Sequence, residues 1–152
     1  MQFNKYVVKR VTPTIGTSAY ADGDGIGTVF TFQQILDPIK KGTVISLGIV
    51  DESNQKAALT LHLFRASPTI GSLDNNALNI GDAELTAKFV TKIDILATDY
   101  ESMTAGAVGS IGNINKGVDS LDGNLYGVLQ SQGAPTYAGT DDLTFVLTVR
   151  ID

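Results

Sequence analysis

The stretch DDLTFVLTVRID, residues 141–152, alternates between apolar and polar positions. Successive side chains of an extended strand point to opposite faces, so an alternation with a period of two gives the strand one apolar face. We therefore expect a β-strand here, half buried against a core. The apolar face carries Leu143, Phe145, Leu147, Val149 and Ile151, and the other face carries Thr144, Thr148 and Arg150.

Two further stretches show the same alternation. AALTLHLF spans residues 57–64, and TVISLGIV spans residues 43–50. Both are expected to form central strands, joined by the polar connection DESNQK. The apolar positions are Leu59, Leu61 and Leu63 in the first stretch, and Ile45, Leu47 and Ile49 in the second.

Connections rich in glycine, proline, serine and asparagine separate weaker strand candidates. The spacing predicts an all-β fold with roughly seven to nine strands, in a two-sheet antiparallel sandwich. At most one short helix is expected, over residues 82–90, where Asp82 is a candidate cap and Glu84 lies four residues before Lys88. The glycine-rich residues 103–117 are expected to hold any mobile surface loop. The weaker strand candidates are KYVVKRV, IGTVFTF, TKIDILA and NLYGVLQS.

The length and composition fit one folded domain. The chain has 152 residues, of which 43% are hydrophobic and 18% are charged, which is too apolar for a disordered protein. We expect residues 1–10 to form an N-terminal segment or arm and residues 11–152 to form a single β-sandwich domain. With no cysteine there is no disulfide or thiolate metal site. No apolar run reaches the ~20 residues that span a bilayer, so no membrane partner is expected.

The charge distribution argues against nucleic acid as a partner. The chain has 16 acidic and 11 basic residues, and most basic residues are isolated in the sequence. The first ten residues are an exception, because they contain Lys5, Lys9 and Arg10 and no acidic residue. These three are either solvated charges of an edge strand or an electrostatic arm that docks on an acidic partner.

The stretch YADGDGIG, residues 20–27, has the composition of a ligand loop but not its spacing. In a calcium loop beginning at Asp22 and Asp24, the third ligand position falls on Ile26, and no glutamate follows within reach. A dinucleotide cradle needs a third glycine where Thr28 stands, and a helix where a strand is expected. We therefore expect a turn whose aspartates bind the backbone.

No catalytic, cofactor or metal site is predicted. His62 is the only histidine, which excludes zinc sites that need two, and as a lone strand histidine it is expected to be structural. Sequence spacing singles out no carboxylate pair for glycoside hydrolysis. Tyr100, Tyr126 and Tyr137 either stack on a sugar or pack at the ends of the sheets.

Three stretches together resemble small structural proteins of tailed bacteriophages, of the capsid decoration or cement type. The resemblance runs from about residue 11 onward, and it rests on strands and turns rather than on an active-site motif. It implies a jelly-roll sandwich that assembles as a homotrimer on the outer capsid surface, with the major capsid protein as partner and a virion location. It also implies that the protein is not an enzyme and has no cofactor. The three stretches are VTPTIGTSAYADGDGIGTVFTF, GTVISLGIVDESNQKAALTLHLFRASPT and LYGVLQSQGAPTYAGTDDLTFVLTV.

In this resemblance Tyr20, Asp24 and Gly27 match the turn that opens the second strand region, and the additional DG of YADGDGIG departs from the family pattern. The three basic residues near the N-terminus, Lys5, Lys9 and Arg10, are expected to touch the capsid shell. The alternative is a phage tail or surface adhesin that grips host glycan through loop tyrosines. A hydrolase with an unrecognised carboxylate pair is a third possibility.

The stretch TFQQILDPIKK, residues 31–41, is too apolar for a free loop. Its large apolar side chains are expected to be covered by the core or by a neighbouring subunit. These side chains are Phe32, Ile35, Leu36 and Ile39.

Overall fold

The computed structural model describes residues 5–152, and these residues form ten strands, one α-helix and one 3-10 helix. The all-β expectation is therefore confirmed. The elements are β1 (Lys5–Val11), β2 (Gly25–Phe32), β3 (Lys41–Asp51), β4 (Leu59–Phe64), α1 (Asp82–Lys88), β5 (Phe89–Ile95), η1 (Ala97–Asp99), β6 (Tyr100–Ser102), β7 (Ala107–Ile111), β8 (Lys116–Asp119), β9 (Leu125–Ser131) and β10 (Leu143–Ile151).

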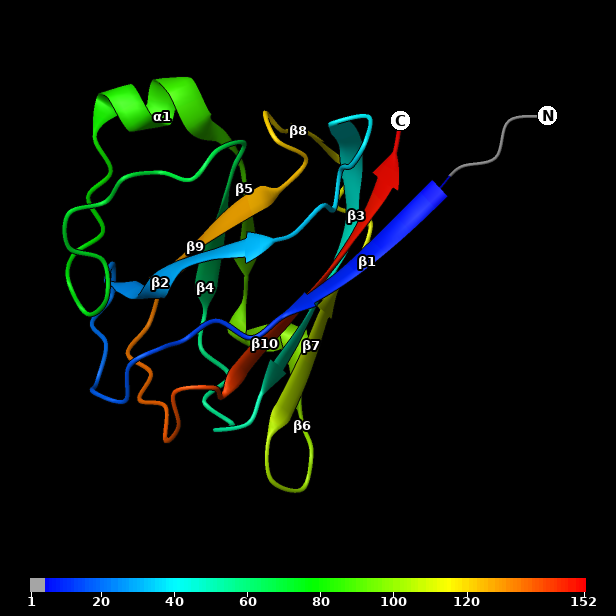
Figure 1. Ribbon diagram of the computed structural model, residues 1–152. Coiled ribbons are helices and arrows are strands. Elements are labelled where there is room, and N and C mark those ends of the chain that lie inside the picture. The colour runs from blue at the N-terminus through cyan, green and yellow to red at the C-terminus, as the bar shows by residue number, and fades with distance from the viewer. Residues whose placement is uncertain (1–4) are drawn as a thin grey trace.

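The strands form two antiparallel sheets that face each other across the core (Figure 1). The six-stranded sheet has the order β1-β10-β3-β7-β6, with β8 also paired to β3. The four-stranded sheet has the order β2-β9-β4-β5. This is the expected two-sheet antiparallel sandwich.

The strand order is that of a jelly roll. Without the short strands β6 and β8, eight strands remain in the described chain. Numbered along the chain, β1, β10, β3 and β7 are the first, eighth, third and sixth, and β2, β9, β4 and β5 are the second, seventh, fourth and fifth. The orders 1-8-3-6 and 2-7-4-5 define the jelly roll, with two interleaved Greek keys. The expected topology is confirmed.

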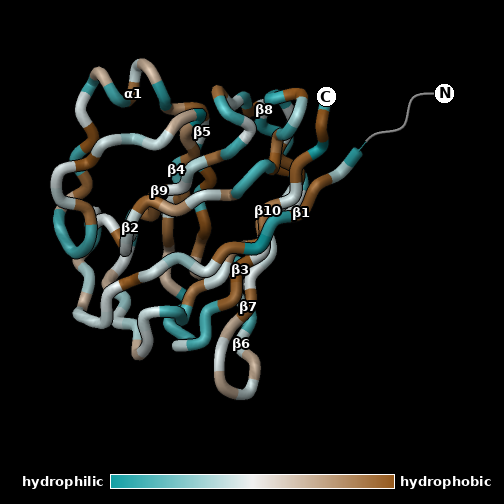
Figure 2. Tube along the Cα trace, viewed as in Figure 1, coloured by the Kyte–Doolittle hydropathy of each residue, from teal (hydrophilic) through white to brown (hydrophobic). Residues whose placement is uncertain are grey.

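The predicted alternation places the core correctly in the two clearest strands. Hydrophobic stretches follow the strands of both sheets (Figure 2). The side chains with no exposed surface include Leu143, Phe145, Leu147 and Val149 of β10, and Leu59, Leu61 and Leu63 of β4.

Strand β3 departs from the alternation at Ile45. The register with β10 shifts between Thr148 and Val149, so Leu47 pairs with Leu147 but Val44 pairs with Val149. The additional residue is a β-bulge, which turns Val44 into the core and leaves Ile45 half-buried. Ile45 is therefore not the core residue that the alternation predicts.

The only α-helix in residues 5–152 is α1, close to the expected range. Lys88 Nζ lies 2.7 Å from Glu84 Oε2, as their spacing predicts. The predicted cap is wrong, because Gly81 occupies the N-cap position and Asp82 lies in the first turn. The backbone is extended from Phe89 onward, where β5 begins.

Residues 103–117 are not one continuous mobile loop. They contain β7 and the start of β8, which both pair with β3. Gly109 lies opposite Ile49, and Gly117 lies opposite Thr43. The glycine-rich sequence has a weak intrinsic preference for strand, so it did not predict β7 and β8. Pairing with the long strand β3 outweighs that weak preference.

Candidate functional site

The outward side of the six-stranded sheet is a candidate interaction surface. Residues directly opposite each other on paired strands point to the same side of a sheet. Because Leu147 and its inward neighbours fill the core, the residues between them and their partners point outward. Five apolar side chains lie on this side, and they are called the outer apolar set. They are Tyr6, Val8, Val50, Val108 and Val146.

The outer apolar set is accessible. Tyr6 and Val8 are 55% and 58% exposed, and Val50, Val108 and Val146 are half-buried. Within residues 5–152 no helix or second sheet covers this side of the six-stranded sheet (Figure 1). An apolar surface that the chain leaves open is a feature of interaction sites.

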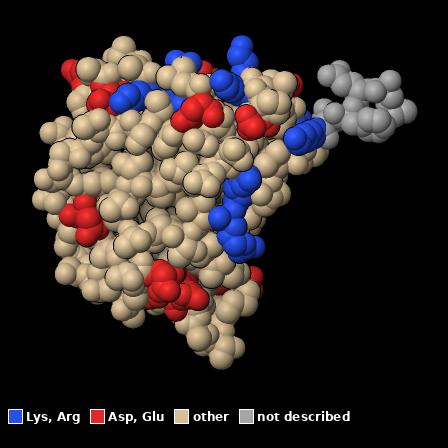
Figure 3. Space-filling view, viewed as in Figure 1, with Lys and Arg blue, Asp and Glu red and all other residues tan. Residues whose placement is uncertain are grey.

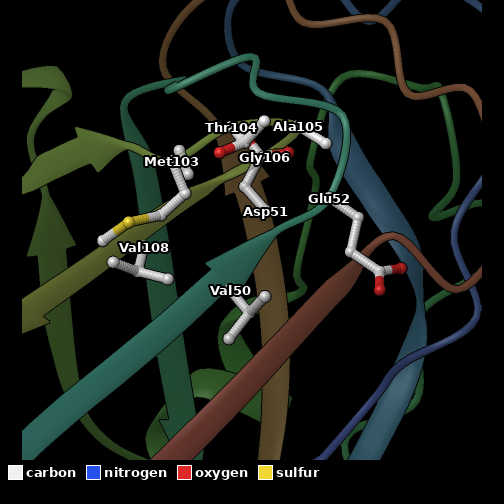
Figure 4. A pocket seen from close by; sticks show the side chains of 9 residues that line it. Val50, Asp51, Glu52, Met103, Thr104, Ala105, Gly106 and Val108 are labelled. Atoms are coloured by element: carbon white, nitrogen blue, oxygen red, sulfur yellow. The ribbon is translucent and has the colours of Figure 1, made fainter.

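A hollow of about 470 Å³ continues this surface at the β6–β7 hairpin. Val50, Val108 and Met103 line it from one side, while Glu52 points away from them (Figure 4). The side chain of Met103 is 53% exposed. The hairpin is closed by the bond from Met103 N to Gly106 O, which measures 2.7 Å.

The three expected capsid-contact residues lie on the edge strand β1, together with most of the segment that we expected to form an arm. Arg10 faces outward opposite Val146, whereas Lys5 and Lys9 lie opposite Ile151 and Leu147 and so face the inner side. Basic side chains gather along this edge of the molecule (Figure 3). The alternation of side chains along a strand already predicts from sequence that Arg10 lies on the side opposite to Lys5 and Lys9. Residues 1–4 lie outside the described residues.

Strand β1 has one unpaired edge. In the described chain it pairs with β10 alone, and no turn or loop backbone bond uses residues 5–11. Inward charges such as Lys9 are typical of edge strands that resist unspecific pairing.

The four apolar residues of the stretch 31–41 have two different environments. Phe32, Ile35 and Leu36 have no exposed surface, so the core covers them and they offer no area to a neighbouring subunit. Ile39 is 54% exposed. Leu121 is 56% exposed, and the two connections that carry Ile39 and Leu121 are joined by the bond from Ser120 N to Lys40 O, which measures 2.9 Å.

The stretch YADGDGIG forms a turn into β2. The φ angles of Gly23 and Gly27 are 90° and 70°, which glycine adopts without strain. Asp24 Oδ2 accepts a bond of 2.9 Å from Ala21 N, as expected for a turn aspartate.

Tyr20 anchors this turn to a distant loop. Its hydroxyl donates to Asp74 Oδ1 at 2.5 Å and accepts from Gly16 N at 2.7 Å. The same Asp74 oxygen accepts from Gly27 N at 2.7 Å. Burial and the Asp74 bond raise the pKa of Tyr20. Sequence reasoning missed Asp74, because no local pattern links residues so far apart.

The lone histidine lies on the outward side of β4. His62 Nε2 lies 3.1 Å from Gln130 Oε1, and burial lowers the pKa of the ring. Among the described residues no hydroxyl or carboxylate forms a hydrogen bond with His62. The arrangement is structural rather than that of a catalytic triad.

Three carboxylates gather beside the start of β10. Oxygen atoms of Glu52, Asp141 and Asp142 lie within 4.8 Å of one another. Asp142 Oδ2 accepts from Gly139 N at 2.9 Å and also from the Ser53 hydroxyl. The buried Asp51 nearby accepts two backbone bonds. Turn geometry accounts for Asp51 and Asp142.

The three candidate sugar-stacking tyrosines do not form a common platform. Tyr137 is only 1% exposed, so its ring cannot stack on a ligand. The hydroxyl of Tyr100 is buried. The hydroxyl of Tyr126 donates to Asp122 Oδ2 at 2.5 Å. No observation favours an adhesin that acts through these residues.

Comparisons with known proteins give only distant likenesses. No protein-family model matches the chain, and no curated protein matches it. Among solved structures, a chain of Tomato Aspermy Virus has a TM-score of 0.42 at 11% identity, covering 97% of this chain and 76% of its own. A chain from the heated full particle of Israeli acute paralysis virus has a TM-score of 0.31 at 11% identity, covering 97% and 71%. Likenesses this weak carry no argument about function. No helix among residues 5–152 has the length and apolar character to cross a membrane.

Proposed function

We propose that the protein is a non-enzymatic virion protein that decorates and stabilises a capsid by binding the major capsid protein. The open outward side of the six-stranded sheet carries this proposal. The sequence resemblance to phage decoration proteins supports it, and jelly rolls occur in viral capsids as well as in lectins. A fold hosts many functions, so the surface carries more weight than the topology.

The chemistry of this side indicates the complementary partner. Its centre is the outer apolar set, whose burial stabilises a complex by about 25 cal/mol for each Å² removed from water. The β1 edge carries Arg10 on this side and Lys5 and Lys9 beside it on the inner side, whereas the acidic Glu101 lies at the β6 edge, opposite Val108. The partner should therefore be apolar at its centre and acidic where it meets β1, because complementary charges fix orientation and speed association.

The direct test compares capsids with and without the protein. Capsids that carry the protein are expected to release their contents only at a higher temperature, or after a stronger osmotic shock, than capsids without it. Equal resistance of the two kinds of capsid would refute the cement role. Replacing Tyr6 and Val8 together by alanine should lower occupancy with little effect on folding, because both side chains are more than half exposed.

Charge reversal tests the β1 edge. Glutamate at Lys5, Lys9 and Arg10 should lower capsid occupancy, and more strongly at low salt. A matched control places glutamate at Lys40, Lys56 and Lys116, which changes the net charge equally away from β1. Equal occupancy of the two variants would refute a contact through β1.

We also propose that the protein is a homotrimer, with Ile39 at the contact between subunits. Ile39 and Leu121 are both more than half exposed, on connections that a backbone bond between Ser120 and Lys40 joins, and large apolar side chains are common at such contacts. Ile39→Asp should reduce the trimer fraction in sedimentation analysis, whereas Leu96→Asp, at a residue 57% exposed elsewhere, should not.

A further inference from the structure

The outward side of the four-stranded sheet carries a connected set of polar side chains. Gln130, Thr60 and Asp94 lie directly opposite one another across β9, β4 and β5. Thr60 Oγ1 donates to Asp94 Oδ1 at 2.9 Å, and Lys92 Nζ lies 2.9 Å from Asp94 Oδ2. The set therefore spans three strands.

Two glutamine amides extend this set. Gln132 Nε2 donates to Thr60 Oγ1 at 3.2 Å and to Gln130 Oε1 at 3.3 Å. Gln130 Nε2 donates to Gly23 O at 3.3 Å. These bonds lie at or beyond the long end of the usual range, so a ligand hydroxyl can replace them at low cost.

Two hollows adjoin the polar set. One, of about 310 Å³, is lined by Thr60, Asp94, Gln132 and their neighbours. The other, of about 290 Å³, lies between His62 and Gln130 on the sheet and Leu78, Ile80 and Leu85 of the segment before β5. Gln130 and Gln132 join the hollows, so polar groups lie beside an apolar wall. A few placed polar groups with apolar walls are typical of small-molecule sites.

Within the polar set the charges of Lys92 and Asp94 cancel. The Lys92 ammonium and the Asp94 carboxylate form an ion pair, and burial lowers the pKa of His62, which favours the neutral ring. The nearby Lys116 Nζ donates to Lys92 O at 2.5 Å, at the margin of the set. A glutamine amide both donates and accepts hydrogen bonds, and so does a hydroxyl group. Side-chain amides are therefore suited to bind neighbouring hydroxyl groups of a ligand.

We propose that this side of the four-stranded sheet binds a neutral sugar, with hydroxyls on Gln130, Gln132 and Asp94 and an apolar ring face toward Leu78, Ile80 and Leu85. The two sheets lie back to back, so a protein docked through its six-stranded sheet would turn this site away from the capsid. Sugar binding itself does not rest on the proposed decoration role and is measured on the free protein.

The test is an NMR titration that follows the side-chain amide signals of the glutamines. The probes are glucose, galactose, mannose and their short neutral oligosaccharides, with sialic acid as an anionic comparison. A neutral probe should shift the signals of Gln130 and Gln132 but not that of Gln55, which lies outside the set. Replacing both glutamines by alanine should weaken binding at least tenfold, which corresponds to about 1.4 kcal/mol.

The control variant is Gln55→Ala, which should leave the affinity unchanged, and thermal melting checks that each variant folds. The proposal is overturned if no neutral probe shifts the two signals. Binding of sialic acid alone, or shifts that persist in the double variant, would equally overturn it.

Discussion

Replacing Tyr20 by phenylalanine tests whether the loop before β2 is held by one buried hydroxyl. Tyr20 is 2% exposed, and its hydroxyl joins Gly16 N to Asp74 Oδ1 at 2.7 and 2.5 Å. Phenylalanine keeps the ring and removes both bonds. Asp74 keeps its bond from Gly27 N, so the carboxylate is not left without a partner.

The size of the effect follows from these contacts. A hydrogen bond to a charged group contributes about 1.5–3 kcal/mol, and the half-buried Gly16 N loses its acceptor, which adds about 1 kcal/mol. We expect Tyr20→Phe to lower the free energy of unfolding by about 2–4 kcal/mol. For a domain of this length, that corresponds to a fall in Tm of about 5–15 °C.

Urea denaturation followed by tyrosine fluorescence measures the change, with the m-value checked for constancy. Tyr126→Phe is the matched control, because it removes a bond of the same 2.5 Å length, to Asp122, from a half-buried tyrosine. Water can replace that bond, so the control should lose less than about 1 kcal/mol. Equal losses in the two variants would refute the argument that burial sets the cost.

Three further predictions follow from the same structure. Leu147→Ala should lower the free energy of unfolding, measured by urea denaturation, by about 2–5 kcal/mol, because Leu147 has no exposed surface. Thr148→Ala, at the neighbouring residue on the outward side, should lower it by less than about 0.5 kcal/mol. A small loss at Leu147 would contradict the assignment of this residue to the core. Gly27→Ala should cost more than Gly23→Ala in the free energy of unfolding, because both have positive φ but of the two only Gly27 would place a Cβ against a backbone oxygen, that of Thr14. Similar losses would contradict this. Burial lowers the His62 pKa from 6.5. The contribution of the neutral ring to the free energy of unfolding is therefore complete above pH 6.5 and is lost as pH falls through the folded-state pKa. His62→Gln should make the free energy of unfolding depend less on pH in this range.

Much of the fold was predictable because side-chain direction in a strand is a local property. The alternation around Leu147 and Leu61 placed the core faces of β10 and β4 without any knowledge of their partners. The weaker candidate KYVVKRV coincides with β1, Lys5–Val11. The same rule failed at Ile45, because a bulge depends on the register with β10.

The candidate surfaces were less predictable. Sequence identified Lys5, Lys9 and Arg10 as a group, and the alternation of a strand separates Arg10 from the two lysines, but only the pairing of β1 with β10 decided that the lysines are on the inner side. The exposed state of Ile39 beside the buried Leu36 depends on how the connection folds back onto Gly123. The polar set around Thr60 joins three strands that are distant in sequence.

The amino-acid sequence by itself determined the all-β class and the inward faces of the main strands, because a period of two is set by the geometry of each residue. It also determined that YADGDGIG is a turn, since Ile26 and the following strand residues leave neither a ligand set nor a helix. Only the tertiary structure decided that Tyr20 meets Asp74, that glycine-rich residues join β3 as β7 and β8, and that residues 5–152 leave one side of the six-stranded sheet uncovered. These features depend on contacts between residues distant in the chain, whose free energy no local pattern contains.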